Sequence, residues 1–196
     1  KAGLPVIAST AGVGLDDIDK VVSFFNHRNI ELAIMHCVGV YPTENKDLFL
    51  NRLDFIRERY DNIRVGFSTH ERPGVLSPVL MAVAKGASIF EKHVGLEDKD
   101  NNITLNEYSC NPGQVLEWVN AITEAYSING EIDKYKIKSN EQEQDALIDL
   151  KRGVFAARDL KKGETYDLKD VFFAMPIIKD QASSEVFSKH NIEFVA

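Results

Sequence analysis

The first 130 residues repeat one pattern four times: a short apolar run, a polar turn, and a longer segment with apolar residues at helical spacing. The runs are continuously apolar and do not alternate with polar residues, so they are typical of parallel strands covered on both faces. The pattern predicts an α/β fold in which four strand–helix units share one parallel sheet. The predicted strands are Leu4–Ser9, Glu31–Cys37, Ile63–Phe67 and Ala87–Glu91.

Four amphipathic segments predict the helices that follow these strands. The first is Leu15–Phe25, and the third runs from about Val75 to Lys85. The second is predicted to carry Phe49, Leu53, Ile56 and Tyr60 on one face, and the fourth, Gln114–Tyr126, to direct Val115, Trp118, Val119 and Ile122 inward.

Two architectures contain such units: a doubly wound sheet and a (β/α)8 TIM barrel. No GxGxxG or GxxxxGKS loop follows any predicted strand, which disfavours a nucleotide-binding doubly wound sheet. The strands end instead in small polar or ionisable residues, as strands do in barrels whose active site lies at their C-terminal ends. The sequence therefore favours part of a barrel over residues 1–130.

The composition changes near Gly130. Residues 131–146 are charged and weakly apolar, which predicts a linker. Residues 147–196 predict a small β-rich domain, which we expect to be truncated. Its predicted parts are a strand at Val154–Ala157, a tight turn at Leu160–Glu164 and a strand at Phe172–Pro176.

Charge and composition exclude several classes of protein. The net charge of −7 argues against a nucleic-acid-binding protein, which would present a basic face. No apolar run approaches the roughly 20 residues of a membrane span, and the first residues lack the apolar core of a signal peptide. Cys37 and Cys110 show no metal-type or redox spacing, which fits a reducing compartment. We therefore expect a cytoplasmic protein with no membrane partner, and the absence of an initial Met indicates a fragment.

One histidine follows each of the last two predicted strands. His70 comes after Val65–Phe67, and His93 comes after Ser88–Phe90. Parallel strands joined by a crossover helix bring both histidines to the same edge of the sheet. Imidazole is the commonest protein metal ligand, so the pair predicts part of an open metal site completed by water and substrate oxygens. The spacing also fits one core histidine and one loop histidine, and that alternative stays open.

Hydroxyl and charged side chains accompany these histidines. Ser9–Thr10 and Ser68–Thr69 precede turns, where hydroxyls and free N–H groups suit a phosphate or a carboxylate; helix capping is the alternative. Glu91 shares the His93 face of its strand and is expected to orient a ligand. Lys92 points to the opposite face by alternation, which disfavours a catalytic role.

Five segments, in the same order along the chain, resemble the sialic acid synthase family, the phosphoenolpyruvate-dependent nonulosonic acid synthases. Pro5–Thr10 resembles the family motif P-V-I-L-S-T, and His36–Thr43 resembles H-C-x-x-x-Y-P-T. Gly66–His70 resembles G-Y-S-D-H, and Glu91–His93 matches E-K-H. Lys151–Pro176 resembles the antifreeze-like SAF domain that follows the barrel in this family. The resemblance therefore covers essentially the whole chain.

The resemblance implies a fold and a set of site residues. The chain would be the C-terminal half of a TIM barrel, strands five to eight, followed by a partial SAF domain. His70 and His93 would be the catalytic metal ligands for Mn²⁺ or Mg²⁺. Ser9 and Ser68 would bind phosphoenolpyruvate, and Tyr41 would bind substrate, with a loop anchor as the alternative role for Tyr41.

The resemblance also implies a reaction, in which a transferase condenses phosphoenolpyruvate with the open-chain aldehyde of an N-acetylmannosamine-like amino sugar. C3 of the enol attacks the aldehyde, water adds to the oxocarbenium carbon, and phosphate leaves. In this family the SAF domain caps the site of a neighbouring subunit, so a homodimer is expected. The family's phosphoenolpyruvate-binding lysines lie on strands one to four, so this segment alone is expected to be inactive.

Several positions depart from the family pattern, and they concern the sugar. Gly39 and Val40 replace polar residues before Tyr-Pro, and Thr69 replaces an Asp. Asn102–Ser109 contains neither the Asp nor the His of the family's G-P-D-H-K-A-S stretch, and Phe172–Ile177 lacks its Arg-Pro-Gly. Two alternatives remain: a non-catalytic carbohydrate-binding or regulatory relative, and a barrel aldolase that uses a strand-end lysine as a Schiff base.

Overall fold

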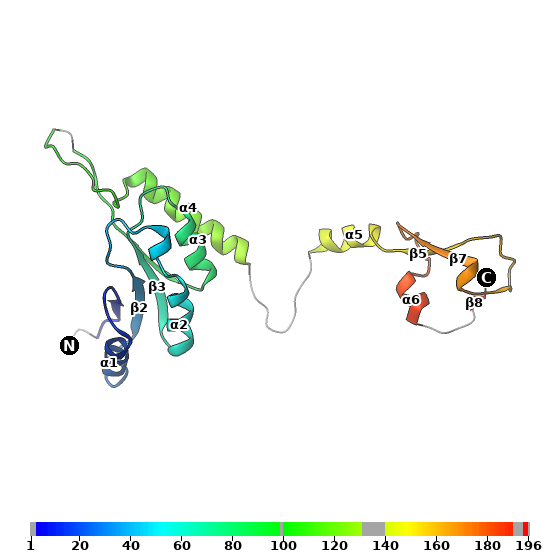
Figure 1. The fold of residues 1–196 in the computed structure, drawn as a ribbon, viewed down its shortest axis with the longest axis horizontal. Helices are drawn as coiled ribbons and strands as arrows, with labels where there is room; N and C mark the ends of the chain where they lie inside the picture. Colours follow the sequence, from blue (N-terminus) through cyan, green and yellow to red (C-terminus); the bar gives the residue numbers. More distant parts are fainter. Residues whose placement is uncertain (1–2, 99, 131–139, 190–193, 196) are drawn as a thin grey trace. The chain divides into compact units, whose positions relative to one another are not determined.

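The computed structural model describes residues 3–98, 100–130, 140–189 and 194–195 (Figure 1). The chain divides into two compact units, Lys1–Glu131 and Ile132–Ala196. Among the described helices, none combines the length and the apolar character needed to cross a membrane.

Four parallel strands form the sheet of the first unit. They are β1 (Val6–Ser9), β2 (Leu32–Cys37), β3 (Arg64–Thr69) and β4 (Ile89–Lys92). Each strand pairs in parallel with the next one along the chain, in the order β1-β2-β3-β4. The four predicted strands are therefore confirmed. Their sequential order is that of a barrel, because a doubly wound sheet reverses its strand order partway across.

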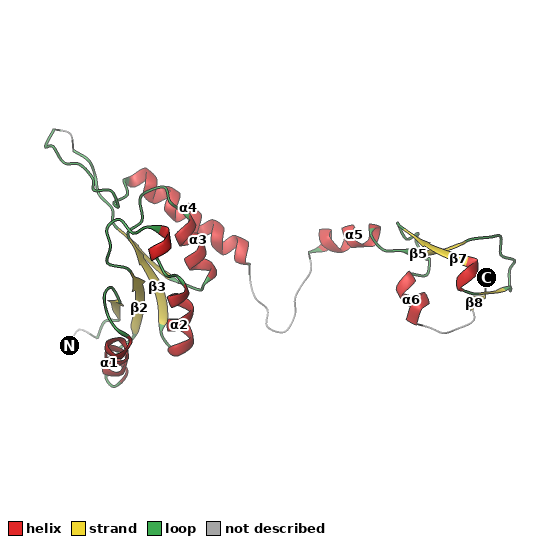
Figure 2. Ribbon diagram, in the orientation of Figure 1, coloured by secondary structure: helices red, strands yellow, loops and turns green. Residues whose placement is uncertain are grey.

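The helices of this unit pack on one face of the sheet. Ile34 and Phe67 lie in one buried cluster with helical residues such as Leu53, and Phe90 packs against Trp118. The described helices of this unit thus cover one face, as in part of a barrel, whereas a doubly wound sheet carries helices on both faces. The helices, drawn in red in Figure 2, are α1 (Leu15–Asn26), α2 (Asn51–Arg59), α3 (Ser77–Ala84) and α4 (Pro112–Asn129).

The strand register places a second set of residues on the opposite face. Ser9 pairs with Met35, Met35 with Gly66, and Gly66 with Ile89, so these residues form one row across the sheet. A Cβ atom on Gly66 would overlap the Met35 sulfur and lie 2.6 Å from the Ile89 carbonyl oxygen. Glycine at this position therefore permits the close approach of β2 and β4 to β3. A second row, Cys37, Ser68 and Glu91, lies closer to the strand ends.

Two details of the helix prediction are wrong. Phe49 precedes α2, has a φ of 48° and is 53% exposed. Its neighbours Leu48 and Leu50 enter the core instead, which leaves the side chain between them outside. In α4, Val119 is exposed, and the helix buries Trp118 together with small alanines.

The second unit contains short antiparallel strand pairs, β5 with β7 and β6 with β8. The predicted strands near Val154 and Phe172 are confirmed as β5 and β7. Residues 131–139 of the predicted linker lie outside the described residues, and the rest of it includes the start of a helix. The elements are α5 (Glu141–Asp149), β5 (Gly153–Ala156), β6 (Thr165–Tyr166), β7 (Val171–Ala174), α6 (Ser184–Lys189) and β8 (Phe194–Val195).

An ion pair joins α1 to the end of α2. Arg59 Nε, Arg59 Nη2 and the Tyr60 hydroxyl donate to the Asp19 carboxylate, at 2.5–2.9 Å. These donors lower the pKa of Asp19 to about 2. A carboxyl whose pKa is lowered on folding stabilises the protein above its unfolded pKa, and that contribution is lost as the pH falls through the folded pKa.

We expect Asp19→Asn to lower the melting temperature at pH 7 by about 1–3 °C. The difference from the unmodified protein should shrink as the pH falls from 4 to 2, and circular dichroism melts at each pH would measure it. Asp17→Asn is the control, because it removes an acid from α1 without breaking the contact to α2. An equal difference at pH 7 and pH 2 would contradict the assignment.

Candidate active site

The ends of β3 and β4 bring His70 and His93 together. Thr69 and Lys92 are the last paired residues of these strands, and each histidine is the next residue along its strand. The two imidazole rings have their centroids 5.1 Å apart. The predicted juxtaposition at one sheet edge is therefore present in the structure.

The two histidines differ in burial. His70 is 3% exposed, and its Nδ1 lies 2.9 Å from the Val38 carbonyl oxygen. A carbonyl only accepts, so Nδ1 carries the proton and Nε2 keeps a lone pair. Burial lowers the pKa of His70, against the opposing effect of the Val38 carbonyl. His93 is exposed, so the burial of the two residues matches the alternative of one core and one loop histidine. The contact between their rings, in contrast, matches a shared site.

Two tyrosine rings complete a histidine–tyrosine cluster of Tyr41, His70, His93 and Tyr108. The Tyr41 ring centroid lies 4.1 Å from that of His70 and 6.0 Å from that of His93. The Tyr108 ring centroid lies 5.1 Å from the ring centroids of both Tyr41 and His93. The sequence prediction included Tyr41 and missed Tyr108. The signal available in the sequence was its place in the segment after β4, which returns to the site where the Cys110 N–H donates to the His93 carbonyl.

The predicted serines lie on the face of the sheet opposite the buried cluster that contains Ile34 and Phe67. The Ser68 side chain is buried, and its hydroxyl donates to Glu91 Oε1 at 2.8 Å. Glu91 therefore fixes the hydroxyl of a predicted substrate-binding residue. That Glu91 also orients a metal ligand stays a prediction. Ser9 is exposed at the end of β1, and its Oγ accepts from the Ala11 N–H at 3.4 Å. The structure places Ser9 on the same face but two strands away from Ser68.

The described residues fit an open divalent-metal site. No group of three or more His, Cys, Asp or Glu side chains gathers in this part of the chain. His70 and His93 would therefore supply two ligands, and water and substrate oxygens would supply the rest. The Nε2 lone pair of His70 and the contact between the rings suit this role.

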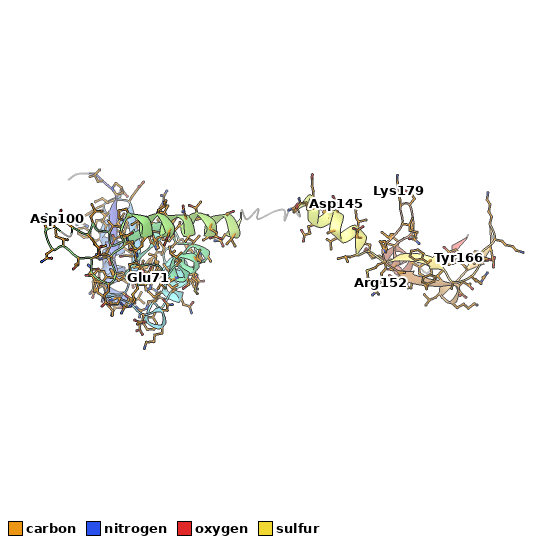
Figure 3. The ribbon with its side chains drawn as sticks, turned by 90° about the horizontal axis from the view of Figure 1, so that it is seen from above. Glu71, Asp100, Asp145, Arg152, Tyr166 and Lys179 are labelled. Atoms are coloured by element: carbon orange, nitrogen blue, oxygen red, sulfur yellow. The ribbon has the colours of Figure 1, made fainter. Side chains whose placement is uncertain are left out.

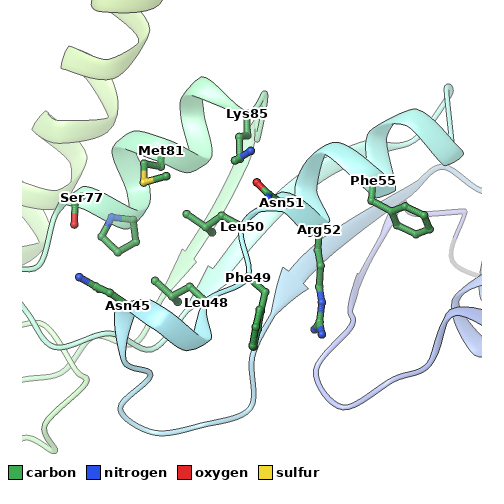
Figure 4. Close-up of a pocket in the computed structure, with 11 residues that line it drawn as sticks. Asn45, Leu48, Phe49, Leu50, Asn51, Arg52, Phe55, Ser77, Met81 and Lys85 are labelled. Atoms are coloured by element: carbon green, nitrogen blue, oxygen red, sulfur yellow. The ribbon is translucent and has the colours of Figure 1, made fainter.

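A separate cavity lies between α2 and α3 (Figure 4). It has a volume of about 510 Å³ and is lined by exposed apolar side chains such as Phe49, Phe55 and Met81, with Arg52 beside them. None of the predicted site residues lines it, so it is separate from the histidine–tyrosine cluster.

The lowered pKa of His70 can be measured directly. In the metal-free protein we expect its imidazole to titrate below the model-peptide value of 6.5, with the neutral ring protonated on Nδ1. Two-dimensional ¹H–¹⁵N NMR reports both properties, and the spectrum of His70→Gln identifies the resonance. A midpoint at or above 6.5, or a proton on Nε2, would contradict the geometry described above.

The chain is 30% identical over 177 residues to the pseudaminic acid synthase of Campylobacter jejuni, covering 88% of this chain and 48% of that protein. A crystal structure from Chromobacterium violaceum, described as spore coat polysaccharide biosynthesis protein E, is 42% identical with a TM-score of 0.83. That likeness covers 100% of this chain and 57% of the other.

The N-acetylneuraminic acid (sialic acid) synthetase of Leptospira borgpetersenii, solved with citrate, is 29% identical with a TM-score of 0.63. This match covers 74% of this chain and 48% of that one. The chain spans about half the length of the curated relatives it matches. Its sheet and helices match part of the TIM-barrel-like fold of these proteins. Residues 1–149 match the NeuB family model, and the chain belongs to the NeuB family.

Proposed function

We propose that this protein is a metal-dependent synthase that condenses phosphoenolpyruvate with an N-acetylmannosamine-like amino sugar. The product would be a sialic acid or a related nonulosonic acid, with release of phosphate. The observation that carries the proposal is the His70–His93 contact at the strand ends, beside the buried Ser68. Relatives named as pseudaminic acid synthase and N-acetylneuraminate-9-phosphate synthase support the reaction class.

The histidines and the serines would have different roles in the reaction. His70 and His93 would hold Mn²⁺ or Mg²⁺, and the ion would polarise the aldehyde oxygen of the sugar. The Val38 carbonyl fixes the His70 ring, so that Nε2 presents its lone pair. The Ser68 hydroxyl and the Ser9 hydroxyl would bind the carboxylate or phosphate of phosphoenolpyruvate on the sheet face opposite the core cluster.

The tyrosines would contact the sugar. Tyr41 and Tyr108 present aromatic rings beside both histidines, and an aromatic face can pack against the C–H groups of a sugar. Tyr108 belongs to the segment that lacks the family's Asp and His. The sugar would therefore be recognised here through ring packing, where the family motif uses a carboxylate.

The second unit has a proposed role as well, and two alternative functions can be compared with the synthase proposal. We propose that residues 147–196 of this unit form a SAF domain, which caps the site of the partner copy in a homodimer. A non-catalytic carbohydrate-binding protein is the second candidate, favoured by Gly39, Val40 and the residues of 102–109. A Schiff-base aldolase is disfavoured, because Lys92 at the end of β4 is buried and paired with Glu71.

Phosphate release tests the proposal. The assay uses the full-length protein containing this segment, with phosphoenolpyruvate, Mn²⁺ and a panel of 2-acetamido sugars. We expect phosphate release with at least one sugar, and its loss on chelation. His70→Gln and His93→Gln should each lower kcat by about 100-fold or more, because each removes a metal ligand. His27→Gln, at an exposed histidine after α1, should leave the rate unchanged.

Two results would separate the candidates. No release above background with any aldehyde would contradict the synthase proposal. Sugar binding by calorimetry without any release would favour the carbohydrate-binding alternative. Borohydride trapping of a lysine adduct with substrate would revive the aldolase.

Tyr108 offers a test of sugar recognition. We expect Tyr108→Ala to raise KM for the sugar by about 3- to 10-fold, the usual worth of one aromatic contact, and to leave KM for phosphoenolpyruvate within about 2-fold. Tyr108→Phe keeps the ring and should stay close to the unmodified protein. Equal effects of Ala and Phe would assign the role to the hydroxyl, and a selective rise in KM for phosphoenolpyruvate would contradict the assignment.

A further inference from the structure

A buried ion pair lies behind the two histidines, on the helix-covered face of the sheet. Lys92 Nζ is 3.0 Å from Glu71 Oε1, and the two side chains are 3% and 2% exposed. The same ammonium donates to the backbone carbonyl of Glu71 at 2.7 Å. The Thr69 hydroxyl donates to the other carboxylate oxygen of Glu71. Figure 3 shows Glu71 within the first unit, whereas Asp100 lies out on the loop between β4 and α4.

The sequence position of this pair is what makes it informative. Glu71 is the residue after His70, and Lys92 is the residue before His93. Backbone pairing between β3 and β4 ends at Thr69 and Lys92. The ion pair therefore links Lys92, the last paired residue of β4, to Glu71, which lies two residues beyond the last paired residue of β3.

The hydrogen bonds of the histidines, unlike their ring contacts, serve each one individually. His70 is tied to the segment after β2, through its Nδ1 contact with Val38 and through the Thr43 N–H, which donates to its carbonyl at 3.1 Å. His93 is tied to the segment before α4 by the Cys110 N–H. Neither set of hydrogen bonds joins one histidine to the other. The Glu71–Lys92 pair joins the chain around one to the chain around the other.

Energetics also point to a positioning role. A buried ion pair gains little net stability, because desolvation of both charges offsets their attraction, and an apolar pair of similar volume often serves the fold equally well. Fixed orientation of metal ligands by the contacts behind them, in contrast, typically changes metal affinity by 10- to 100-fold. The surrounding hydrogen bonds to Thr69 and to the backbone hold the pair in one geometry.

We propose that Glu71 and Lys92 are positioning residues that set the separation of His70 and His93 and thereby the affinity of the site for a divalent cation. This inference rests on the metal site of the proposed function. It gives a role to Lys92, for which alternation along the strand disfavours direct catalysis, and to Glu71, which the sequence did not single out.

The test measures Mn²⁺ affinity and stability separately. Electron paramagnetic resonance of free Mn²⁺ gives the Kd of the full-length protein, and thermal melts give its Tm. The charge-balanced variant Glu71→Gln/Lys92→Met removes the pair without leaving one charge buried. We expect its Kd to rise by about 10-fold or more while the Tm stays within a few degrees.

The matched control is Asp54→Asn/Lys85→Met. It removes another ion pair that links separate elements of the first unit, at side chains 33% and 21% exposed, and it involves no residue of the histidine–tyrosine cluster. Its Kd should equal that of the unmodified protein. Lys92→Arg retains the charge but cannot place one compact ammonium against both Oε1 and the backbone carbonyl oxygen of Glu71, so its Kd should also rise.

The outcomes separate this inference from the proposed function. If the unmodified protein binds no Mn²⁺, the metal site itself fails, and the inference fails with it. If the unmodified protein binds Mn²⁺ and both Glu71→Gln/Lys92→Met and Lys92→Arg bind equally well, the positioning role is overturned and the metal site stands. If the double variant does not fold, the Kd of folded Lys92→Arg decides: a rise supports the inference, and no change overturns it.

Discussion

The parallel pairing of β3 with β4 is the constraint on which the site depends. It pairs Thr69 with Lys92, so the next residue on each strand is a histidine, and both histidines lie at the same end of the sheet. Residues separated by 23 positions in sequence thereby share one edge. A shift of the register by one residue would send one of the two side chains to the opposite face, because side chains alternate along a strand.

The two faces of this sheet carry different kinds of side chain. The helix-covered face holds the apolar core, with Ile34, Leu53 and Phe67 among its buried members. The other face carries the polar residues Ser9, Ser68 and Glu91. A second layer of helices on that face would separate these side chains from solvent and from any ligand. This division is the reason why a partial barrel, with its reactive edge at the C-terminal strand ends, agrees with both the packing and the family match.

Much of the fold could be predicted from the sequence, because continuous apolar runs and helical periodicity are local signals. The four strands, their helices and the family all follow from such signals and from the motifs. The errors at Phe49 and Val119 arose where a turn or small alanines took the buried positions. Of the candidate site, Tyr41, His70 and His93 were predicted from the strand ends and the motifs, whereas Tyr108 was not, since its loop carries no periodic signal.

The sequence by itself determined the order of strands and helices, the family, and the two histidines that follow neighbouring strands. Only the tertiary structure decided that His70 is buried with its Nδ1 against Val38, that Tyr108 returns to the site, and that Glu71 reaches Lys92 behind it. The physical reason is that sequence patterns report which face a residue occupies. Distances across strands and through loops depend on register and packing, which arise only when the whole sheet forms.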